Sequence, residues 1–191
     1  FAVLFRMNAQ SRVLEENLRR LQIPYRIVGG KSFFDRREVK DLIAYMSVLV
    51  NPGDDANLLR IINTPARGIS AATIEHALQA SVQQRSSLWD ALHSPALLAE
   101  LSSRTAASIQ TFIALVDEYE TKLLEPLSDP AAIVPKLIEE VGYPAELRRS
   151  CKSAERAEAR TSHLQDMLRG PPHFTHRSNN GLLGFPRGLR P

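Results

Sequence analysis

Cysteine is nearly absent from this sequence, with Cys151 as the single example among 191 residues. A lone thiol cannot close an internal disulfide or build a cysteine-based metal site, which fits a reducing compartment. Long apolar runs are absent too, since none approaches the roughly 18 residues of a membrane-spanning helix. The N-terminus has no signal-peptide pattern. We therefore expect a cytoplasmic protein with no membrane partner.

A charge excess of one sign is also lacking over most of the chain. The formal net charge is +3, but residues 171–191 contain Arg177, Arg187 and Arg190 and no acid, so residues 1–170 sum to zero. Bulk basicity therefore does not indicate nucleic-acid binding, and any such contact must come from particular groups. The histidines show no metal-ligand spacing and no nucleophile partner, so we assign no catalytic or metal role.

Strand candidates are few and lie at the start of the chain. The segments 1–6 (FAVLFR) and 25–28 (YRIV) are short and β-prone. Between them, a helix with Asn8 as a possible cap and Pro24 as its end completes a βαβ unit. No strand candidate follows Gly68, so the predicted fold is α/β followed by all-α, mainly helical overall.

Helical spacing of apolar residues and capping signals predict the remaining elements. The expected helices cover residues 37–50, 54 or 55 to 62, 70 onward, 86 onward, 102–124, 129–141 and 154–168. Gly142 is a predicted C-terminal cap. From Gly170 the sequence is rich in Pro, Gly and Asn without periodicity, so 170–191 is expected to be an irregular or disordered tail.

Three blocks of the first 69 residues carry a family resemblance. They are FAVLFRMNAQSRVLEENL (1–18), IPYRIVGGKSFFDRREVKDLIAYM (23–46) and NPGDDANLLRIINTPARGI (51–69). In order and spacing they resemble the second RecA-like motor subdomain of superfamily 1 DNA helicases of the UvrD/Rep type. Residues 70–168 look like the helical insertion of that subdomain, less closely. Beyond 170 there is no resemblance.

The resemblance implies a division into domains and an activity. It divides the chain into a partial motor subdomain (1–67), a helical insertion subdomain (68–169) and the tail (170–191). The implied parent is an ATP-dependent helicase of the bacterial cytosol, acting in replication or repair, that moves 3′ to 5′ on single-stranded DNA and separates the duplex. ATP and Mg²⁺ are its implied cofactors, and single-stranded and forked DNA and the remaining helicase subdomains its partners.

The first candidate site follows the first predicted strand. By resemblance, Asn8 meets a base or sugar of the single strand, with Arg6 and Arg12 near the strand or the nucleotide cleft. An amide can hydrogen-bond a base edge or sugar, and a guanidinium suits phosphate. The alternative is that Asn8 only caps its helix, and the two roles are compatible because a cap leaves the amide NH₂ free.

The second candidate site is the segment Thr64-Pro65-Ala66-Arg67-Gly68-Ile69-Ser70. It resembles the loop that contacts the duplex backbone ahead of the fork. A glycine turn leading into a helix N-terminus offers backbone N–H groups to an anion, and Arg67 adds charge. Ser70 stands where the family usually has a second glycine, which bears on how closely DNA can approach. The alternative is an ordinary interdomain turn.

Two further features have a structural interpretation. Phe33 and Phe34 are expected to pack as core, and Arg37 and Asp41 to pair on a solvated helix face, although Arg36 or Lys40 could touch DNA. Trp89 is expected to be a core anchor rather than a base-stacking platform.

The resemblance has competitors. One is a non-catalytic helical module that binds another protein through its exposed faces, with the turns purely structural. A separate expectation concerns physical state, because two strands cut from a larger sheet have unpaired edges through which the chain can self-associate.

One prediction follows from a missing motif. A motor of this kind needs a Gly-x-x-x-x-Gly-Lys-Ser/Thr loop to hold the nucleotide phosphates, and the chain has no complete loop of that pattern. We expect no bound cofactor and no ATP hydrolysis by this 191-residue chain alone, measured as phosphate release with single-stranded DNA present. DNA-stimulated turnover by the purified chain would contradict this.

Overall fold

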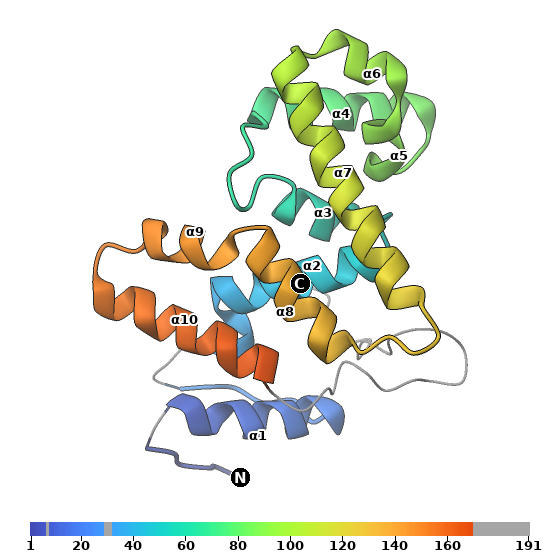
Figure 1. Ribbon diagram of the computed structural model, residues 1–191. Coiled ribbons are helices and arrows are strands. Elements are labelled where there is room, and N and C mark those ends of the chain that lie inside the picture. The colour runs from blue at the N-terminus through green and yellow to red at the C-terminus, as the bar shows by residue number, and fades with distance from the viewer. Residues whose placement is uncertain (7, 29–31, 170–191) are drawn as a thin grey trace.

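The computed structural model describes residues 1–6, 8–28 and 32–169, apart from the side chains of residues 8, 9 and 169. This part of the chain is mainly helical (Figure 1). Its elements are α1 Asn8–Arg20, the 3-10 turn η1 Phe33–Asp35, α2 Arg37–Val50, α3 Asp55–Ile61, α4 Ala71–Gln84, α5 Leu88–His93, α6 Pro95–Glu100, α7 Ser103–Leu124, α8 Pro130–Glu140, α9 Tyr143–Ser150 and α10 Ala154–Arg169.

Local capping signals set most of these boundaries, as the sequence predicted. Asp54, Ser70 and Ser102 each accept a hydrogen bond from a backbone N–H in the first turn of α3, α4 and α7. The short helix predicted from Ser86 is capped one residue later, by Ser87. Helix α9 was not predicted. It begins directly after Gly142, whose φ of +74° ends α8 and turns the chain at once into the next helix.

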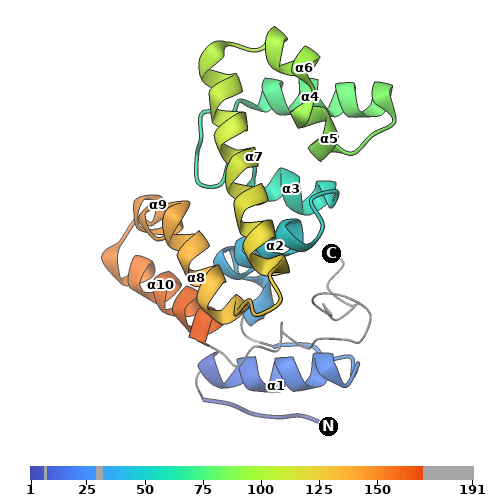
Figure 2. The same cartoon turned by 45° about the vertical axis from the view of Figure 1, so that its right-hand side comes forward.

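Helix α2 lies at the centre of the molecule (Figure 2). It packs against η1, α3, α7 and α10, and its side chains from Val39 to Leu49 are buried except for Lys40 and the partly exposed Ser47. Phe33 and Phe34 of η1 are buried beside it, which confirms their predicted core role. A helix enclosed on this many sides holds the elements around it in place.

Helix α7 joins two groups of helices. Its 22 residues span about 33 Å at 1.5 Å per residue. One end packs near α5, in the group that α4, α5 and α6 form, and α7 also contacts α2 and α8 in the other group (Figure 1). Trp89 of α5 lies partly buried against Phe112 of α7, with ring centroids 6.5 Å apart, which fits the predicted core anchor.

Asp41 departs from its predicted place on a solvated face. Its side chain is only 3% exposed. It forms ion pairs with Arg60 at 2.7 Å and with Arg37 at 3.5 Å, and it accepts a hydrogen bond from the hydroxyl of Tyr143 at 2.6 Å. A buried carboxylate is tolerated when such donors surround it. Asp41 thus ties α2 to α3 and α9 through a polar cluster inside the core.

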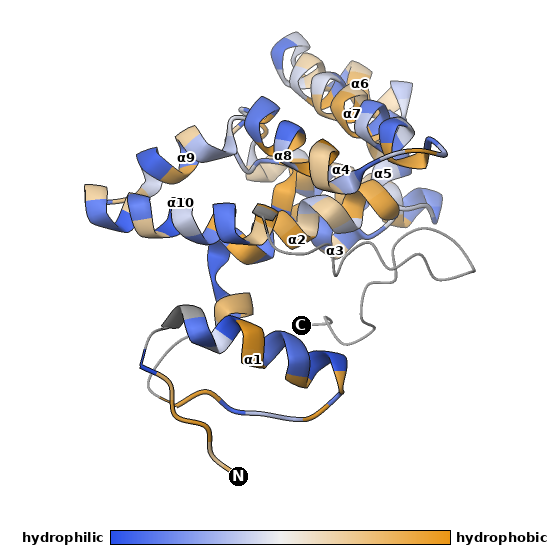
Figure 3. Ribbon diagram, turned by 60° about the horizontal axis from the view of Figure 1, so that its bottom comes forward, coloured by the Kyte–Doolittle hydropathy of each residue, from blue (hydrophilic) through white to orange (hydrophobic). Residues whose placement is uncertain are grey.

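The two predicted strands are not strands in the described part of the chain. Residues 1–6 and 25–28 have no ladder partner there, and Phe1, Val3, Leu4 and Val28 are exposed. Figure 3 shows the apolar N-terminal segment, residues 1–5, beside α1 at the edge of the molecule. A strand forms only when another strand completes its hydrogen bonds, so β-prone residues alone did not suffice. The predicted tail, 170–191, lies outside the described residues.

No helix in the described ranges combines the length and apolar character needed to cross a membrane.

The Asp41 cluster generates a stability prediction. Burial raises the pKa of Tyr143, and the neighbouring Asp41 carboxylate adds to the effect, so the hydroxyl remains a donor at all ordinary pH values. Tyr143→Phe removes one donor from a buried carboxylate and should lower the free energy of unfolding by about 1.5–3 kcal/mol in a urea titration.

Tyr119→Phe is the matched control. The Tyr119 hydroxyl donates to Glu140 at the same 2.6 Å, but Glu140 is exposed and water can replace the lost donor. This change should cost less than about 1 kcal/mol. Equal losses for the two variants would contradict a special role for the buried cluster.

Candidate functional site

The first candidate group lies at the start of α1. Arg6 is exposed, and its backbone N–H donates to Oε1 of Gln10 at 3.1 Å. The side chain of Asn8 lies outside the described residues, so its predicted contact with a base or sugar stays a prediction. Arg6 is therefore the member of this group whose guanidinium is available at the surface.

Arg12 is engaged within the protein. Its Nε pairs with Glu16 at 2.7 Å, one Nη donates to the carbonyl of Asp166 in α10, and the guanidinium stacks over the ring of Phe33 at 4.9 Å. The side chain is 15% exposed. Arg12 thus joins α1 to η1 and α10, and its predicted role near DNA or nucleotide stays untested.

Glu15 has a role that sequence reasoning missed. The i,i+4 spacing of Glu15 and Arg19 predicts an ion pair on the solvent side of the helix, but Glu15 is 2% exposed. Its carboxylate accepts from the hydroxyls of Ser32 and Tyr25 and from the backbone N–H of Phe33. No local signal could have revealed this, because the donors lie 10 to 18 residues away.

The second candidate group, Thr64 to Ser70, connects α3 to α4. Arg67 organises it from within. One Nη of Arg67 donates to the carbonyls of Ile61 at 2.8 Å, Ile62 at 3.2 Å and Pro65 at 3.2 Å. Carbonyls at a helix C-terminus lack intrahelical partners and carry partial negative charge. The guanidinium therefore caps the end of α3.

The remaining contacts of Arg67 fasten the loop to α2 and α7. Its other Nη donates to the hydroxyl of Tyr45 at 2.6 Å, and that hydroxyl donates to the carbonyl of Thr64 at 2.6 Å. The guanidinium also lies 4.8 Å from the ring centroid of Phe112. Burial raises the pKa of Tyr45 against the opposing effect of Arg67, so its hydroxyl keeps the proton that it donates. The loop is thus held by a side chain that was predicted to contact DNA.

Gly68, Ile69 and Ser70 have three different environments. Gly68 is exposed with φ of +76°, and a Cβ added to it would meet no atom of residues 1–6, 8–28 or 32–169 within 4 Å. Ile69 is 1% exposed and anchors the turn in the core. Ser70 is exposed, and its hydroxyl caps α4 by accepting from the N–H of Thr73 at 3.1 Å. An exposed glycine between two anchored residues leaves an open approach to the start of α4.

The two candidate groups are not brought together. In Figures 1 and 2, α1 lies on the opposite side of α2 from the connection between α3 and α4. Helix α1 packs mainly against η1.

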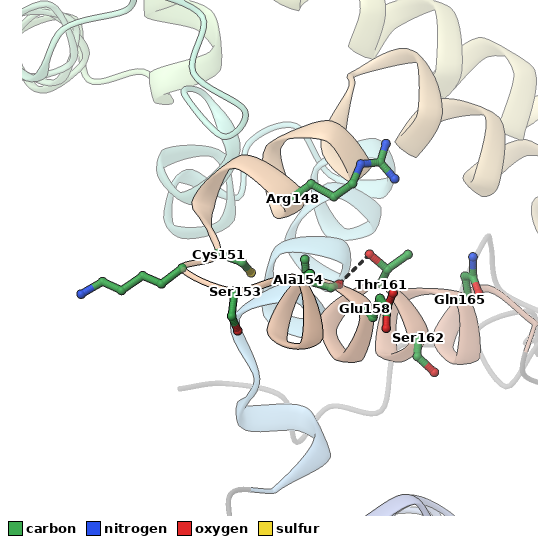
Figure 4. A pocket seen from close by; sticks show the side chains of 10 residues that line it. Arg148, Cys151, Ser153, Ala154, Glu158, Thr161, Ser162 and Gln165 are labelled. Atoms are coloured by element: carbon green, nitrogen blue, oxygen red, sulfur yellow. Dashed lines mark hydrogen bonds between the residues drawn. The ribbon is translucent and has the colours of Figure 1, made fainter.

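A separate hollow of about 710 Å³ lies between the end of α9 and the start of α10. Figure 4 shows it lined by Arg148, Cys151 and Glu158 among others, none of them a predicted site residue. Within the described ranges no group of three or more metal-ligating side chains is present.

Known proteins are similar to this chain over the stretch that contains both groups. A family model described as the UvrD-like helicase C-terminal domain matches residues 1–139. The chain is 38% identical over 168 residues to the ATP-dependent DNA helicase Rep of Salmonella typhimurium, covering 88% of this chain and 24% of the relative.

Two more relatives agree with that match. DNA helicase II of Escherichia coli is 43% identical over 116 residues, covering 61% of this chain and 16% of the relative. The ATP-dependent DNA helicase PcrA of Staphylococcus epidermidis is 35% identical over 189 residues, covering 96% and 25%. The chain thus spans about a quarter or less of the length of these curated relatives.

The contacts of Arg67 generate a prediction about stability. Arg67→Ala removes the donors to three carbonyls and to Tyr45 and should lower the free energy of unfolding by about 2–4 kcal/mol. Arg67→Lys should recover less than half of that loss, because one ammonium cannot reproduce the planar fork. Urea denaturation followed by circular dichroism measures both.

Arg104→Ala is the control, because Arg104 is exposed in the first turn of α7. It should change stability by no more than about 0.5 kcal/mol. A loss for Arg67→Ala that is no larger than the control would overturn the structural role of Arg67.

Proposed function

This chain belongs to the UvrD-like helicase C-terminal domain family, and we propose that it is the DNA-contacting part of an ATP-dependent DNA helicase of the UvrD/Rep type. The expected resemblance to that family is therefore confirmed. Three relatives that are named DNA helicases support the proposal over a non-catalytic interaction module.

The proposed parent moves along single-stranded DNA in the 3′ to 5′ direction and separates the duplex, in replication or repair. Rep and PcrA are described as ATP-dependent, which supports ATP, with Mg²⁺, as the cofactor of the parent. Because this chain has no complete phosphate-binding loop, nucleotide hydrolysis is proposed to reside in other subdomains, with single-stranded and forked DNA as the shared partner.

Within that parent, residues 1–67 are proposed to belong to the second RecA-like motor subdomain and residues 68–169 to its helical insertion. The exposed apolar side chains of Phe1, Leu4 and Val28 support this, since a sheet supplied by other subdomains would cover them. In the chain by itself, the same segments are the surface through which self-association is expected.

The exposed turn at Gly68 is the observation that carries the DNA-binding proposal. Its backbone can approach a ligand closely because it has no Cβ, and no atom of the described residues fills the space beside it. The buried Ile69 side chain and the Arg67 clamp hold the turn on both sides, so little ordering remains to be done on binding.

The start of α4 adds an electrostatic reason. Ser70 uses its hydroxyl on Thr73, which leaves the N–H groups of Ala71 and Ala72 without an acceptor in the described part of the chain. Free N–H groups at a helix N-terminus attract a phosphate oxygen. We propose that Gly68, Ile69 and Ser70 contact DNA through the backbone or the Ser70 hydroxyl, with Arg67 shaping the loop and adding positive potential. Thr64 is proposed to contact DNA through its hydroxyl, because its backbone N–H and carbonyl already bond to Ile61 and Tyr45.

At the other group, Arg6 is proposed to contact the phosphate backbone of the single strand, with Asn8 at a base or sugar. The exposure of Arg6 supports its part of this proposal.

Gly68→Ala tests the role of the turn. A methyl group there meets no atom in the described part of the chain, so the folding cost comes from the positive φ and is about 1 kcal/mol. The same methyl group occupies the approach to the backbone, and the affinity for a forked DNA should fall roughly tenfold, or about 1.4 kcal/mol. Fluorescence anisotropy with labelled DNA at constant salt measures it.

Gly142→Ala is a matched control. Gly142 has almost the same φ, +74°, and equally open surroundings, but it lies between α8 and α9. It should show the same folding cost with unchanged DNA affinity. If both variants bound DNA as tightly as the unmodified chain, the turn would have no part in DNA binding.

A further inference from the structure

A groove of about 500 Å³ lies between the start of α2 and one face of α10. Its lining is dominated by cations. The cationic side chains are Arg36, Arg37, Lys40, Arg60, Arg156 and Arg160. Only two carboxylates, Asp35 and Glu38, line the groove, and Asp41 is the third acid close by. Cations therefore exceed acids by three, on a chain whose first 170 residues are neutral in total.

Two of the three acids lie inside, whereas the third, Asp35, is 58% exposed and pairs with Lys40 at 3.1 Å. The side chains of Glu38 and Asp41 are only 4% and 3% exposed. The cationic side chains of Arg37, Lys40 and Arg160 are 55%, 46% and 36% exposed. Charges close to the solvent dominate the electrostatic potential that a ligand experiences at the surface. The groove therefore presents a positive potential.

Helix α10 presents its basic residues in a fixed position. Arg156, Arg160 and His163 share one face, at spacings of four and three residues. His163 accepts from an Nη of Arg36 through Nε2, so its proton is on Nδ1, which donates to Glu38 at 2.8 Å. This relay from Arg36 through His163 to Glu38 fastens α10 against the start of α2.

Arg156 is the most available of the cations. It is exposed, and its guanidinium has no partner in the described part of the chain. Arg160 lies one turn further, about 6 Å along the helix, and its Nε is 4.0 Å from Glu38. Two guanidinium groups at that separation can each reach a different phosphate of an extended strand.

We propose that this groove binds the phosphate backbone of DNA, as a second contact separate from the turn at Gly68. The proposal rests on the proposed function for its choice of DNA as the ligand. Among the described residues that line the groove, none is an aromatic platform for a base. The guanidinium groups that line it suit phosphate oxygens, so the contact is with the backbone and carries no sequence preference.

The test is the salt dependence of binding to a labelled forked DNA by the 191-residue chain. In Arg156→Ala/Arg160→Ala, two phosphate contacts are lost, and the slope of log affinity against log salt should become shallower by about 1.8 on duplex DNA. Arg156→Ala alone should account for about half of this, and it disturbs no internal contact of Arg156's side chain. Arg85→Ala/Arg104→Ala removes the same charge from two exposed positions, the C-cap of α4 and the first turn of α7, and should leave the slope unchanged.

The outcomes separate the two proposals. An unchanged slope for Arg156→Ala and for the double variant, with weakened binding by Gly68→Ala, overturns the groove and leaves the proposed function standing. No salt-dependent DNA binding by the unmodified chain overturns both. A calorimetric titration with inorganic phosphate provides the other arm. If the heat of phosphate binding is lost in Arg156→Ala/Arg160→Ala while the salt dependence of DNA binding is unchanged, the groove binds free phosphate. That result overturns the DNA backbone as its ligand.

Discussion

Burial of α2 is the constraint on which the other contacts depend. The helix is enclosed by four neighbouring elements, yet it carries two carboxylates, Glu38 and Asp41, into that interior. An unpaired buried charge is strongly unfavourable, so each carboxylate requires donors from elsewhere in the chain. His163 of α10 serves Glu38, and Tyr143 of α9 joins two arginines around Asp41. The arrangement of α9 and α10 around α2 follows from satisfying these two groups.

The same helix controls the loop proposed to meet DNA. Tyr45 of α2 donates to Thr64 and receives from Arg67, and Arg67 caps the end of α3. Pre-organisation of this kind lowers the ordering cost of binding. A guanidinium with this many internal partners acts mainly on the shape of the loop, and the exposed backbone at Gly68 is the part that a phosphate can reach.

Arginines in this protein thus fall into two groups. Arg12, Arg60 and Arg67 have their guanidinium groups engaged by carboxylates, carbonyls or rings of the protein itself. Arg6 and Arg156 point their charge to the solvent. Near-zero net charge over residues 1–170 hides this division. Affinity for a polyanion depends on the exposed group, because a charge already paired in a partly buried cluster contributes little field outside the protein.

The sequence by itself determined most of the helices, though not α9, together with caps such as Ser70, the core role of Phe33 and Phe34, and the family. These features depend on residues within three or four positions of one another, or on long blocks of direct identity.

Only the tertiary structure decided that β-prone residues 1–6 would lack a ladder partner in the described chain, that Asp41 would be buried, and that Arg67 would cap α3. It also decided that α10 would bring its basic face to α2. Those outcomes depend on partners far along the chain, 102 residues away for Asp41 and Tyr143 and 125 for Glu38 and His163, and periodicity and capping signals carry no information over such separations.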